Sequence, residues 1–165
     1  MKFSKKKSAF DINYDGLRRQ GYRAVMFDLD NTLVPDGALA NLKASNLIKR
    51  LHKLGFKICV LSNNSSYKRV HDFEVATGVD LAVYKAGKPF LKGFNEAMQV
   101  LEVKPEETVF IGDRVFTDML GGLRAGLYTI LVSPIDKSTD GPATRILRKI
   151  EKPIRGTLNL IPGIR

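Results

Sequence analysis

The chain has 165 residues, 44% of them hydrophobic, and a formal net charge of +10 at pH 7. This length and apolar content predict a single domain whose core can hold a sheet with helices on both faces. No apolar run approaches the ~20 residues of a membrane span, and none follows the basic start as in a signal peptide, so we expect a cytoplasmic protein. The single cysteine, Cys59, excludes an intramolecular disulfide, and the apolar run around it predicts a buried thiol.

Strand-like and helix-like segments alternate along the middle of the chain. Short apolar runs predict strands, and apolar residues at helical spacing predict helices that each lay one apolar stripe on a sheet. In chain order we predict a strand at 24–29, a helix at 39–54, a strand at 57–61, a helix at 67–77, a strand at 81–84, a helix at 89–101, a strand at 108–111, a helix at 116–125, a strand at 128–132 and a helix at 143–151. Strands joined by helices need crossover connections, so we expect an α/β fold with a doubly wound, mainly parallel sheet.

Basic residues crowd the two ends of the chain, whereas the middle is closer to charge balance. We therefore divide the chain into a basic N-terminal segment (1–23), a core (24–132) and a basic C-terminal helix and tail (133–165), with the last helix as an appendage. Positive ends favour nucleic acid or an anionic membrane surface as partner, or they serve solubility alone. The aromatic-interleaved basic motifs of known RNA-binding modules do not occur in the sequence.

Polar residues cluster at or just after the ends of four of the predicted strands. The clusters are Asp28-Leu-Asp30, Ser62-Asn63, Lys88 and Gly112-Asp113 with Asp118. Taken singly, each is typical of an ordinary turn or helix cap. Together they belong at the carboxyl ends of parallel strands, where open α/β sheets bind ligands. We therefore expect all four clusters to line one crevice.

The chemistry of this crevice follows from its side chains. It would hold four carboxylates: Asp28, Asp30, Asp113 and Asp118. Crowded carboxylates repel one another unless a cation joins them, and oxygen ligands without a His or Cys cluster favour Mg²⁺. A phosphate monoester fits the remaining groups, because Lys88 and the metal would neutralise its oxygens and Ser62 would donate a hydrogen bond. Asp28 is then the expected nucleophile.

The four clusters, in this order and at these separations, resemble the motifs of the haloacid dehalogenase (HAD) superfamily: Asp28-Leu-Asp30-Asn-Thr32, Ser62, Lys88 and Gly112-Asp113 with Asp118. The resemblance covers about residues 24–132 and implies a Rossmann-like fold and hydrolysis through an aspartyl-phosphate. It implies that Asp28 is nucleophile and metal ligand. Asp30 would be the general acid/base and would lend its backbone carbonyl to the metal.

The same resemblance assigns roles to the other matched positions. Ser62 and Asn63 would bind the phosphoryl group, and Lys88 would balance charge on nucleophile and phosphate. Asp113 would ligate Mg²⁺. Asp118 and Thr32 would lie just outside the ligands, with Asp118 orienting water or the lysine.

A narrower resemblance is to subclass IIIA and its YqeG-type family, which includes phosphatidylglycerophosphatases. It rests on Phe27-Asp-Leu-Asp-Asn-Thr-Leu-Val34, Lys88-Pro89 and the run from Gly112 to Gly126. Arg114 departs from that pattern, which has a glutamine after the motif aspartate. Because this position flanks an implied metal ligand, the departure bears on substrate preference.

The intervals between the motifs leave no room for a cap domain. The interval 32–61 is filled by one predicted helix and one strand, and the interval 63–87 by another such pair. An uncapped crevice cannot close a lid over a small substrate, so it suits a phosphate presented on something large.

The last predicted helix has two different sides. Ile146, Leu147 and Ile150 share one side, and a basic set lies toward another: Arg145, Arg148 and Lys152. This pattern is typical of a helix in a membrane interface, where each basic residue can add ~1 kcal/mol of attraction to an anionic surface. A helix that packs on the sheet with a solvated charged face would show it too.

These observations predict a Mg²⁺-dependent phosphatase of phosphatidylglycerophosphate that makes peripheral contact with the inner face of the membrane. Two alternatives remain at this point. One is a HAD phosphatase acting on another exposed phosphate, on a protein, a polynucleotide end or a sugar. The other is a basic RNA- or ribosome-binding protein that keeps the fold without using the site. A pure binding protein has no physical need to crowd four carboxylates, which argues against the last alternative.

Overall fold

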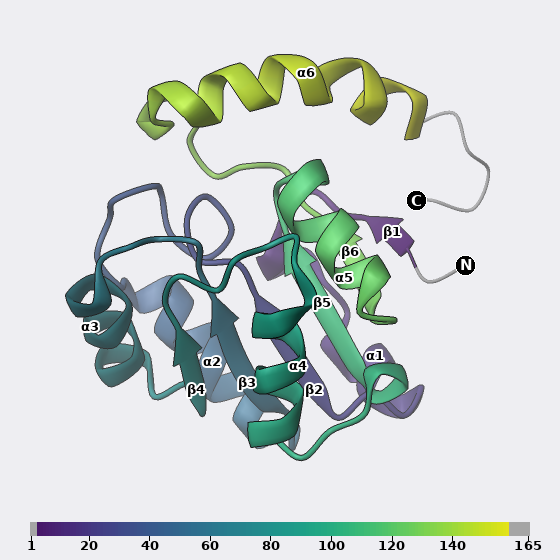
Figure 1. The fold of residues 1–165 in the computed structure, drawn as a ribbon. Helices are drawn as coiled ribbons and strands as arrows, with labels where there is room; N and C mark the ends of the chain where they lie inside the picture. Colours follow the sequence, from purple (N-terminus) through teal and green to yellow (C-terminus); the bar gives the residue numbers. More distant parts are fainter. Residues whose placement is uncertain (1–2, 159–165) are drawn as a thin grey trace.

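The computed structural model describes residues 3–158, which form a parallel sheet with helices on both faces (Figure 1). The strand order is β1-β6-β5-β2-β3-β4, and every neighbouring pair is parallel. The strands are β1 (Phe3–Lys5), β2 (Ala24–Phe27), β3 (Lys57–Leu61), β4 (Leu81–Val83), β5 (Thr108–Gly112) and β6 (Tyr128–Leu131). The predicted doubly wound α/β fold is confirmed.

Residues 3–158 form six α-helices, most of which cover the two faces of this sheet in two groups. They are α1 (Tyr14–Arg19), α2 (Leu42–Lys53), α3 (Tyr67–Thr77), α4 (Leu91–Val100), α5 (Leu120–Arg124) and α6 (Pro142–Leu158). Residues of α1, α2 and α3 pack in one apolar cluster with Val25 and Phe27 of β2. Residues of α4 pack in a second cluster with Met26 of the same strand. This division follows from the alternation of side chains along a strand, and it explains why β2 is apolar throughout.

The register of the central strands decides where the polar residues meet. Phe27 at the end of β2 pairs with Val60 of β3 on one side and with Ile111 of β5 on the other. The three strands therefore end at the same level. Asp28 and Asp113, which follow β2 and β5 within two residues of that level, emerge side by side at the carboxyl edge.

Two elements of the basic N-terminal segment have no counterpart in the predicted set. Strand β1 extends the sheet by pairing with β6, with Phe3 opposite Thr129. Helix α1 buries Tyr14, whose hydroxyl donates a hydrogen bond of 2.6 Å to the carbonyl of Ala9. A three-residue strand within a lysine-rich run is too short to show a periodic pattern, so only pairing with β6 reveals it.

Several helices have boundaries that differ from the predicted ones. Helix α2 begins at Leu42 and not at residue 39, because the side chain of Asn41 caps it by accepting a 2.9 Å hydrogen bond from the Ala44 N–H. Helix α4 begins at Leu91, two residues after the predicted start. The predicted helix 116–125 is divided into a π-helical turn, Val115–Met119, and the short α5. Such π-helical segments are frequent at functional sites.

Helix α6 is longer than predicted and lies across the carboxyl edge of the sheet (Figure 1). It runs over Pro142–Leu158, whereas the sequence predicts a helix at 143–151. The ends of the predicted basic segments, residues 1–2 and 159–165, lie outside the described residues. Cys59 is buried, as predicted. No described helix combines the length and apolar character needed to cross a membrane.

Candidate active site

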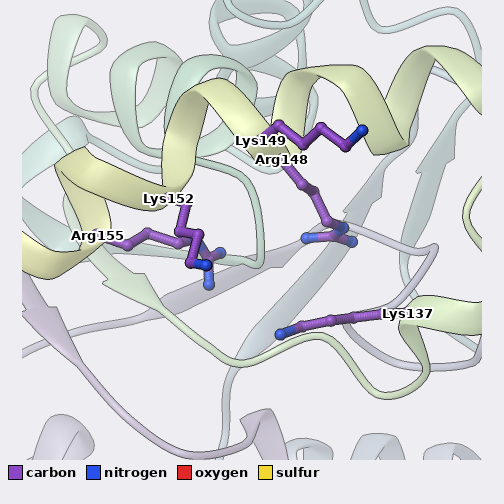
Figure 2. Close-up of a pocket in the computed structure, with 5 residues that line it drawn as sticks. All are labelled: Lys137, Arg148, Lys149, Lys152 and Arg155. Atoms are coloured by element: carbon purple, nitrogen blue, oxygen red, sulfur yellow. The ribbon is translucent and has the colours of Figure 1, made fainter.

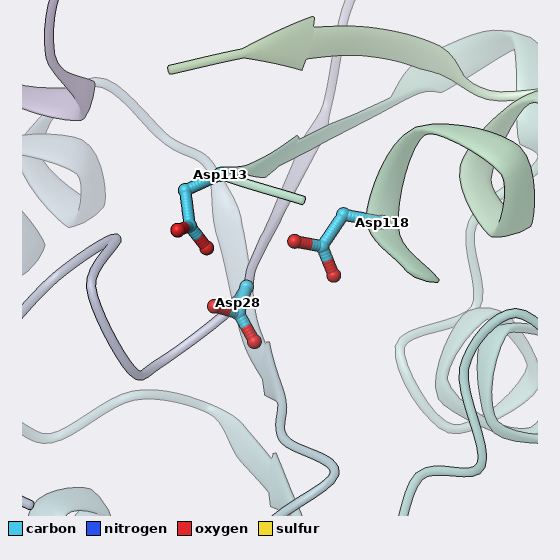
Figure 3. Close-up of side chains that lie close together, drawn as sticks. All are labelled: Asp28, Asp113 and Asp118. Atoms are coloured by element: carbon cyan, nitrogen blue, oxygen red, sulfur yellow. The ribbon is translucent and has the colours of Figure 1, made fainter. Parts of the chain in front are cut away.

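Three buried carboxylates meet at the carboxyl edge of the sheet (Figure 3). Asp28 follows β2, Asp113 follows β5 and Asp118 comes from the π-helical turn. One carboxylate oxygen of each lies within 4.8 Å of the others, an arrangement that can hold a metal ion. The donors are all hard oxygen atoms, which fit a hard divalent cation. We refer to Asp28, Asp113 and Asp118 as the acidic triad.

A buried lysine joins two members of the triad. The Nζ atom of Lys88 lies 2.6 Å from Asp28 Oδ1 and 2.9 Å from Asp118 Oδ1. Burial by itself lowers the pKa of the Lys88 ammonium, but Asp118 and Asp28 outweigh that effect, and the net pKa is raised. Lys88 therefore carries a full positive charge at neutral pH.

Two carboxyl groups of the triad, those of Asp28 and Asp113, are harder to ionise than ordinary ones. Burial is the main reason that the pKa of Asp28 is raised, and Lys88 only partly offsets it. Burial, followed by the charge of Asp118, raises the pKa of Asp113 to about 6. A site that keeps carboxylates so close together in a dry environment is suited to a cation, because a cation favours the ionised forms.

Local packing and hydrogen bonds position the members of the triad. Thr32 Oγ1 lies 3.2 Å from Asp28 Oδ2 and 3.5 Å from Asp113 Oδ1, and it donates toward these two oxygens. Gly112 leaves room for Asp118, since a Cβ atom at residue 112 would lie 2.5 Å from Asp118 Oδ2. The same Oδ2 accepts a 2.9 Å hydrogen bond from the Arg114 N–H, which closes the π-helical turn.

The two residues after β3 have different surroundings. The Asn63 side chain donates to the Lys88 carbonyl and accepts from the Lys88 N–H, both at 2.8 Å. Asn63 therefore fixes the backbone of the lysine. Ser62 is buried, and its Oγ accepts a 3.0 Å hydrogen bond from the Asn64 N–H. Phosphate binding by Ser62 and Asn63 stays a prediction.

Asp30 lines the crevice but does not belong to the acidic triad. Its Oδ1 forms an ion pair with Arg69 of α3 and accepts a 3.3 Å hydrogen bond from the Gly37 N–H. Its Oδ2 accepts from the Asn64 side chain at 3.4 Å. The sequence analysis missed Arg69, because nothing in a charged helix face indicates a partner 39 residues away.

A cavity of about 210 Å³ opens above these groups, and its lining includes Asp28, Asp30, Asn63, Lys88 and Asp113. No cap domain is inserted between the motifs in the described chain, as predicted. However, the expectation that the last helix is an appendage is wrong. Helix α6 forms one wall of the crevice through Thr144, Leu147 and Arg148.

Arg148 is the most direct link between α6 and the triad. Its Nη2 atom lies 2.6 Å from Asp113 Oδ2 and 3.0 Å from Asp140 Oδ1. Asp140 is buried and accepts a 2.8 Å hydrogen bond from the side chain of Asn31. Both alternatives for the last helix, a membrane-facing basic side and a solvated charged face, are therefore wrong for Arg148, because two buried carboxylates draw its guanidinium inward.

A buried glutamate of α6 holds the π-helical turn. Glu151 is fully buried, and its Oε1 accepts hydrogen bonds from the N–H groups of Val115 at 3.0 Å and Phe116 at 3.1 Å. The Nε of Arg114 lies 3.6 Å from the same oxygen. Arg114, the position that departs from the family pattern, thus has a partner on α6. Glu151 gave no sequence signal, since a lone Glu on a helix is usually solvated.

Comparisons with known proteins agree with this geometry. The HAD-hydrolase-like family model matches residues 85–142. The chain is 39% identical to the probable phosphatase YqeG of Bacillus subtilis over 153 residues, which are 92% of this chain and 87% of that protein. It is 30% identical to the chloroplastic/mitochondrial phosphatidylglycerophosphate phosphatase 1 of Arabidopsis thaliana over 151 residues, 85% of this chain but only 42% of that longer protein.

Solved structures show the same fold. A D,D-heptose 1,7-bisphosphate phosphatase from B. bronchiseptica, complexed with magnesium and phosphate, superposes with a TM-score of 0.55 at 15% identity. The match covers 66% of this chain and 79% of the other. With similarity to YqeG over nearly the whole length of both proteins, the chain belongs to the YqeG-type family of HAD phosphatases.

Proposed function

We propose that this HAD phosphatase removes the terminal phosphate of phosphatidylglycerophosphate through an aspartyl-phosphate on Asp28 and depends on Mg²⁺. The observation that carries the proposal is the contact of Lys88 with Asp28 and Asp118 inside the acidic triad. A lysine and a cation beside the same carboxylate can together neutralise the charge on the three oxygens of a phosphoryl group.

The residues of the chain would divide the reaction into two steps. Asp28 attacks phosphorus while the bond to the ester oxygen breaks, and Asp30 protonates the leaving oxygen. Asp30 then takes a proton from water, which attacks the aspartyl-phosphate and releases inorganic phosphate. Lys88 stabilises the charge on the transferred group, and Thr32 fixes the orientation of the nucleophile at 3.2 Å.

The metal would be held by Asp28, Asp113 and the backbone carbonyl of Asp30. When bound, Mg²⁺ supplies positive charge that polarises the phosphoryl oxygens. Asp118 belongs to the acidic triad by distance, but it also contacts Lys88. We therefore assign Asp118 to orienting the lysine.

An exposed, large substrate suits this crevice better than a small one. No cap domain is inserted over it in the described chain, and α6, which lies across the same edge, forms only one of its walls. The name of the Arabidopsis relative supports the lipid phosphatidylglycerophosphate as the specific substrate. The YqeG relative, with higher identity, is named only as a probable phosphatase.

The outer side of α6 supports contact with an anionic membrane. Ile146, Ile150 and Ile154 recur every four residues, and they are 61%, 53% and 37% exposed. Basic residues flank this apolar stripe, and this combination is typical of helices that bind lipid interfaces. A lipid phosphate could then enter the crevice from the surface on which the helix lies.

The decisive experiment measures phosphate release from phosphatidylglycerophosphate in mixed micelles. Purified protein is freed of metal with a chelator and assayed with and without added Mg²⁺. We expect release of phosphatidylglycerol and phosphate only with the metal. A clear preference for a phosphoprotein, a polynucleotide end or a sugar phosphate in parallel assays would move the substrate to that class. Absence of turnover on every monoester would contradict the proposed function itself.

A further inference from the structure

A second cavity, of about 330 Å³, lies beside the catalytic crevice. Five basic residues line it: Lys137, Arg148, Lys149, Lys152 and Arg155. Figure 2 shows that Lys137 extends from its loop toward the space below α6, into which Lys152 and Arg155 also point. We call this cavity the basic pocket. The side chains that line it are all basic, although Asp113, Asp140 and Glu151 contact its two arginines from behind, and such a lining favours an anion.

Among the described residues, three of the five charges of the basic pocket have no acidic partner, whereas Arg148 is paired with Asp113 and Asp140. Within residues 3–158, Lys137, Lys149 and Lys152 form no ion pair. Arg155 has Glu151 at 4.0 Å, a limiting distance for an ion pair. Burial lowers the pKa of the Arg155 guanidinium; Asp113 and Glu151 only partly offset this effect, to which the nearby Arg148 adds. Like charges held together in this way are stabilised by a bound anion.

The basic pocket is connected to the catalytic crevice through one residue. Arg148 lines both cavities and contacts Asp113 of the acidic triad. A single molecule that reaches from the triad past Arg148 would therefore place a second group among the lysines. That group must be anionic and rich in oxygen acceptors, because the lining offers ammonium and guanidinium donors only.

We propose that the basic pocket binds a second phosphate group of the substrate, a phosphodiester on the same molecule as the phosphomonoester that Asp28 attacks. The inference rests on the proposed function. A phosphodiester keeps its negative charge at every physiological pH, and clustered Lys and Arg side chains are its usual partners in proteins. The pocket would thereby select substrates with two phosphates over simple monoesters.

The first test compares two soluble substrates in a matched pair of variants. Glycerophosphoglycerol phosphate carries a monoester and a diester without lipid tails, and glycerol 3-phosphate carries the monoester alone. The variant K137Q/K152Q removes two charges from the basic pocket. The control K49Q/K53Q removes two exposed charges from α2, far from the pocket.

The measured quantity is kcat/KM for glycerophosphoglycerol phosphate divided by kcat/KM for glycerol 3-phosphate. We expect this ratio to fall about tenfold in K137Q/K152Q, or about threefold per lysine, because the KM for glycerophosphoglycerol phosphate rises. The control should keep the wild-type ratio. An equal loss on both substrates, or an unchanged ratio, would overturn the proposal.

The second test is a binding measurement that does not depend on turnover. Glycerophosphoglycerol, which has the diester but no monoester, is titrated calorimetrically into wild-type protein and both double variants. We expect about tenfold weaker binding in K137Q/K152Q alone. If K137Q/K152Q selectively weakens binding of glycerophosphoglycerol but the wild-type protein is inactive on all monoesters, the proposed function is refuted and the phosphate site is still supported.

Two further arms separate the sources of the anion. If vesicles rich in phosphatidylglycerol bind through Lys137 and Lys152 while soluble glycerophosphoglycerol does not bind, the lysines serve the membrane surface and the pocket is not a substrate site. If only an oligonucleotide binds there, the partner is nucleic acid. Either result would overturn the proposal.

Discussion

The guanidinium of Arg148 lies 2.6 Å from the carboxylate of Asp113 and thereby joins the C-terminal helix to the acidic triad. The partners stand on α6 and just after β5, and both side chains are largely buried, at 13% and 1% exposure. Charged groups are rarely buried without a partner, so this pair constrains where α6 can lie. The helix is therefore part of the site and not an extension of the core.

Replacing Asp28 by Asn should abolish turnover, with a loss of more than about 10³-fold in kcat, because no neighbouring group can take over a nucleophile's role. The loss of turnover is measured as the rate of phosphate release under saturating Mg²⁺. The matched control is Asp72→Asn, which removes an exposed carboxylate of α3 whose one ion pair within residues 3–158 is with Lys68. Near wild-type activity of Asp28→Asn would exclude the aspartyl-phosphate mechanism.

Replacing Arg148 by Ala should lower the Mg²⁺ concentration for half-maximal activity by about threefold. A positive charge 2.6 Å from Asp113 Oδ2 repels a cation at the triad, and its removal relieves that repulsion. A Mg²⁺ titration of the activity tests this. Arg145→Ala, an exposed change on the same helix, should leave the midpoint in place. A raised midpoint for Arg148→Ala would show instead that the arginine orients Asp113 for the metal.

Replacing Glu151 by Ala should destabilise the fold by about 2–4 kcal/mol, because two backbone N–H groups lose a buried acceptor and Arg114 loses its ion-pair partner. Glu151→Gln keeps an acceptor oxygen and should cost less. Denaturant unfolding gives both values, with the exposed Glu106→Ala as control. Equal stability of Glu151→Ala and wild type would contradict the role of α6 in holding the π-helical turn.

The apolar stripe of α6 should carry membrane binding. Ile146→Glu combined with Ile150→Glu should weaken co-sedimentation with phosphatidylglycerol-rich vesicles, and high salt should weaken it further by screening. Ile135→Glu changes a 42% exposed isoleucine outside α6 and serves as the control. Equal binding to neutral and anionic vesicles would remove the electrostatic part of this prediction.

Short-range patterns in the sequence were sufficient to predict the core of the fold. The fully apolar β2, flanked by helices with one apolar stripe, predicts a central parallel strand, and β2 lies between β3 and β5. The clusters around Asp28, Lys88 and Asp113 follow from this, because residues after parallel strands must emerge at one edge. The order of strands and polar residues along the chain therefore predicts that Lys88 and Asp28 lie at the same edge of the sheet.

Only the tertiary structure decided what completes the site. Strand β1 exists because β6 offers it an edge, and no three-residue pattern can signal such a pairing. The contacts of Asp30 with Arg69 and of Asp113 with Arg148 join residues 39 and 35 positions apart. Sequence periodicity reports which side of a helix is apolar, but it does not report which buried carboxylate an arginine will meet. The position of α6 over the crevice is therefore set by long-range charge pairing, which depends on distances in the folded chain.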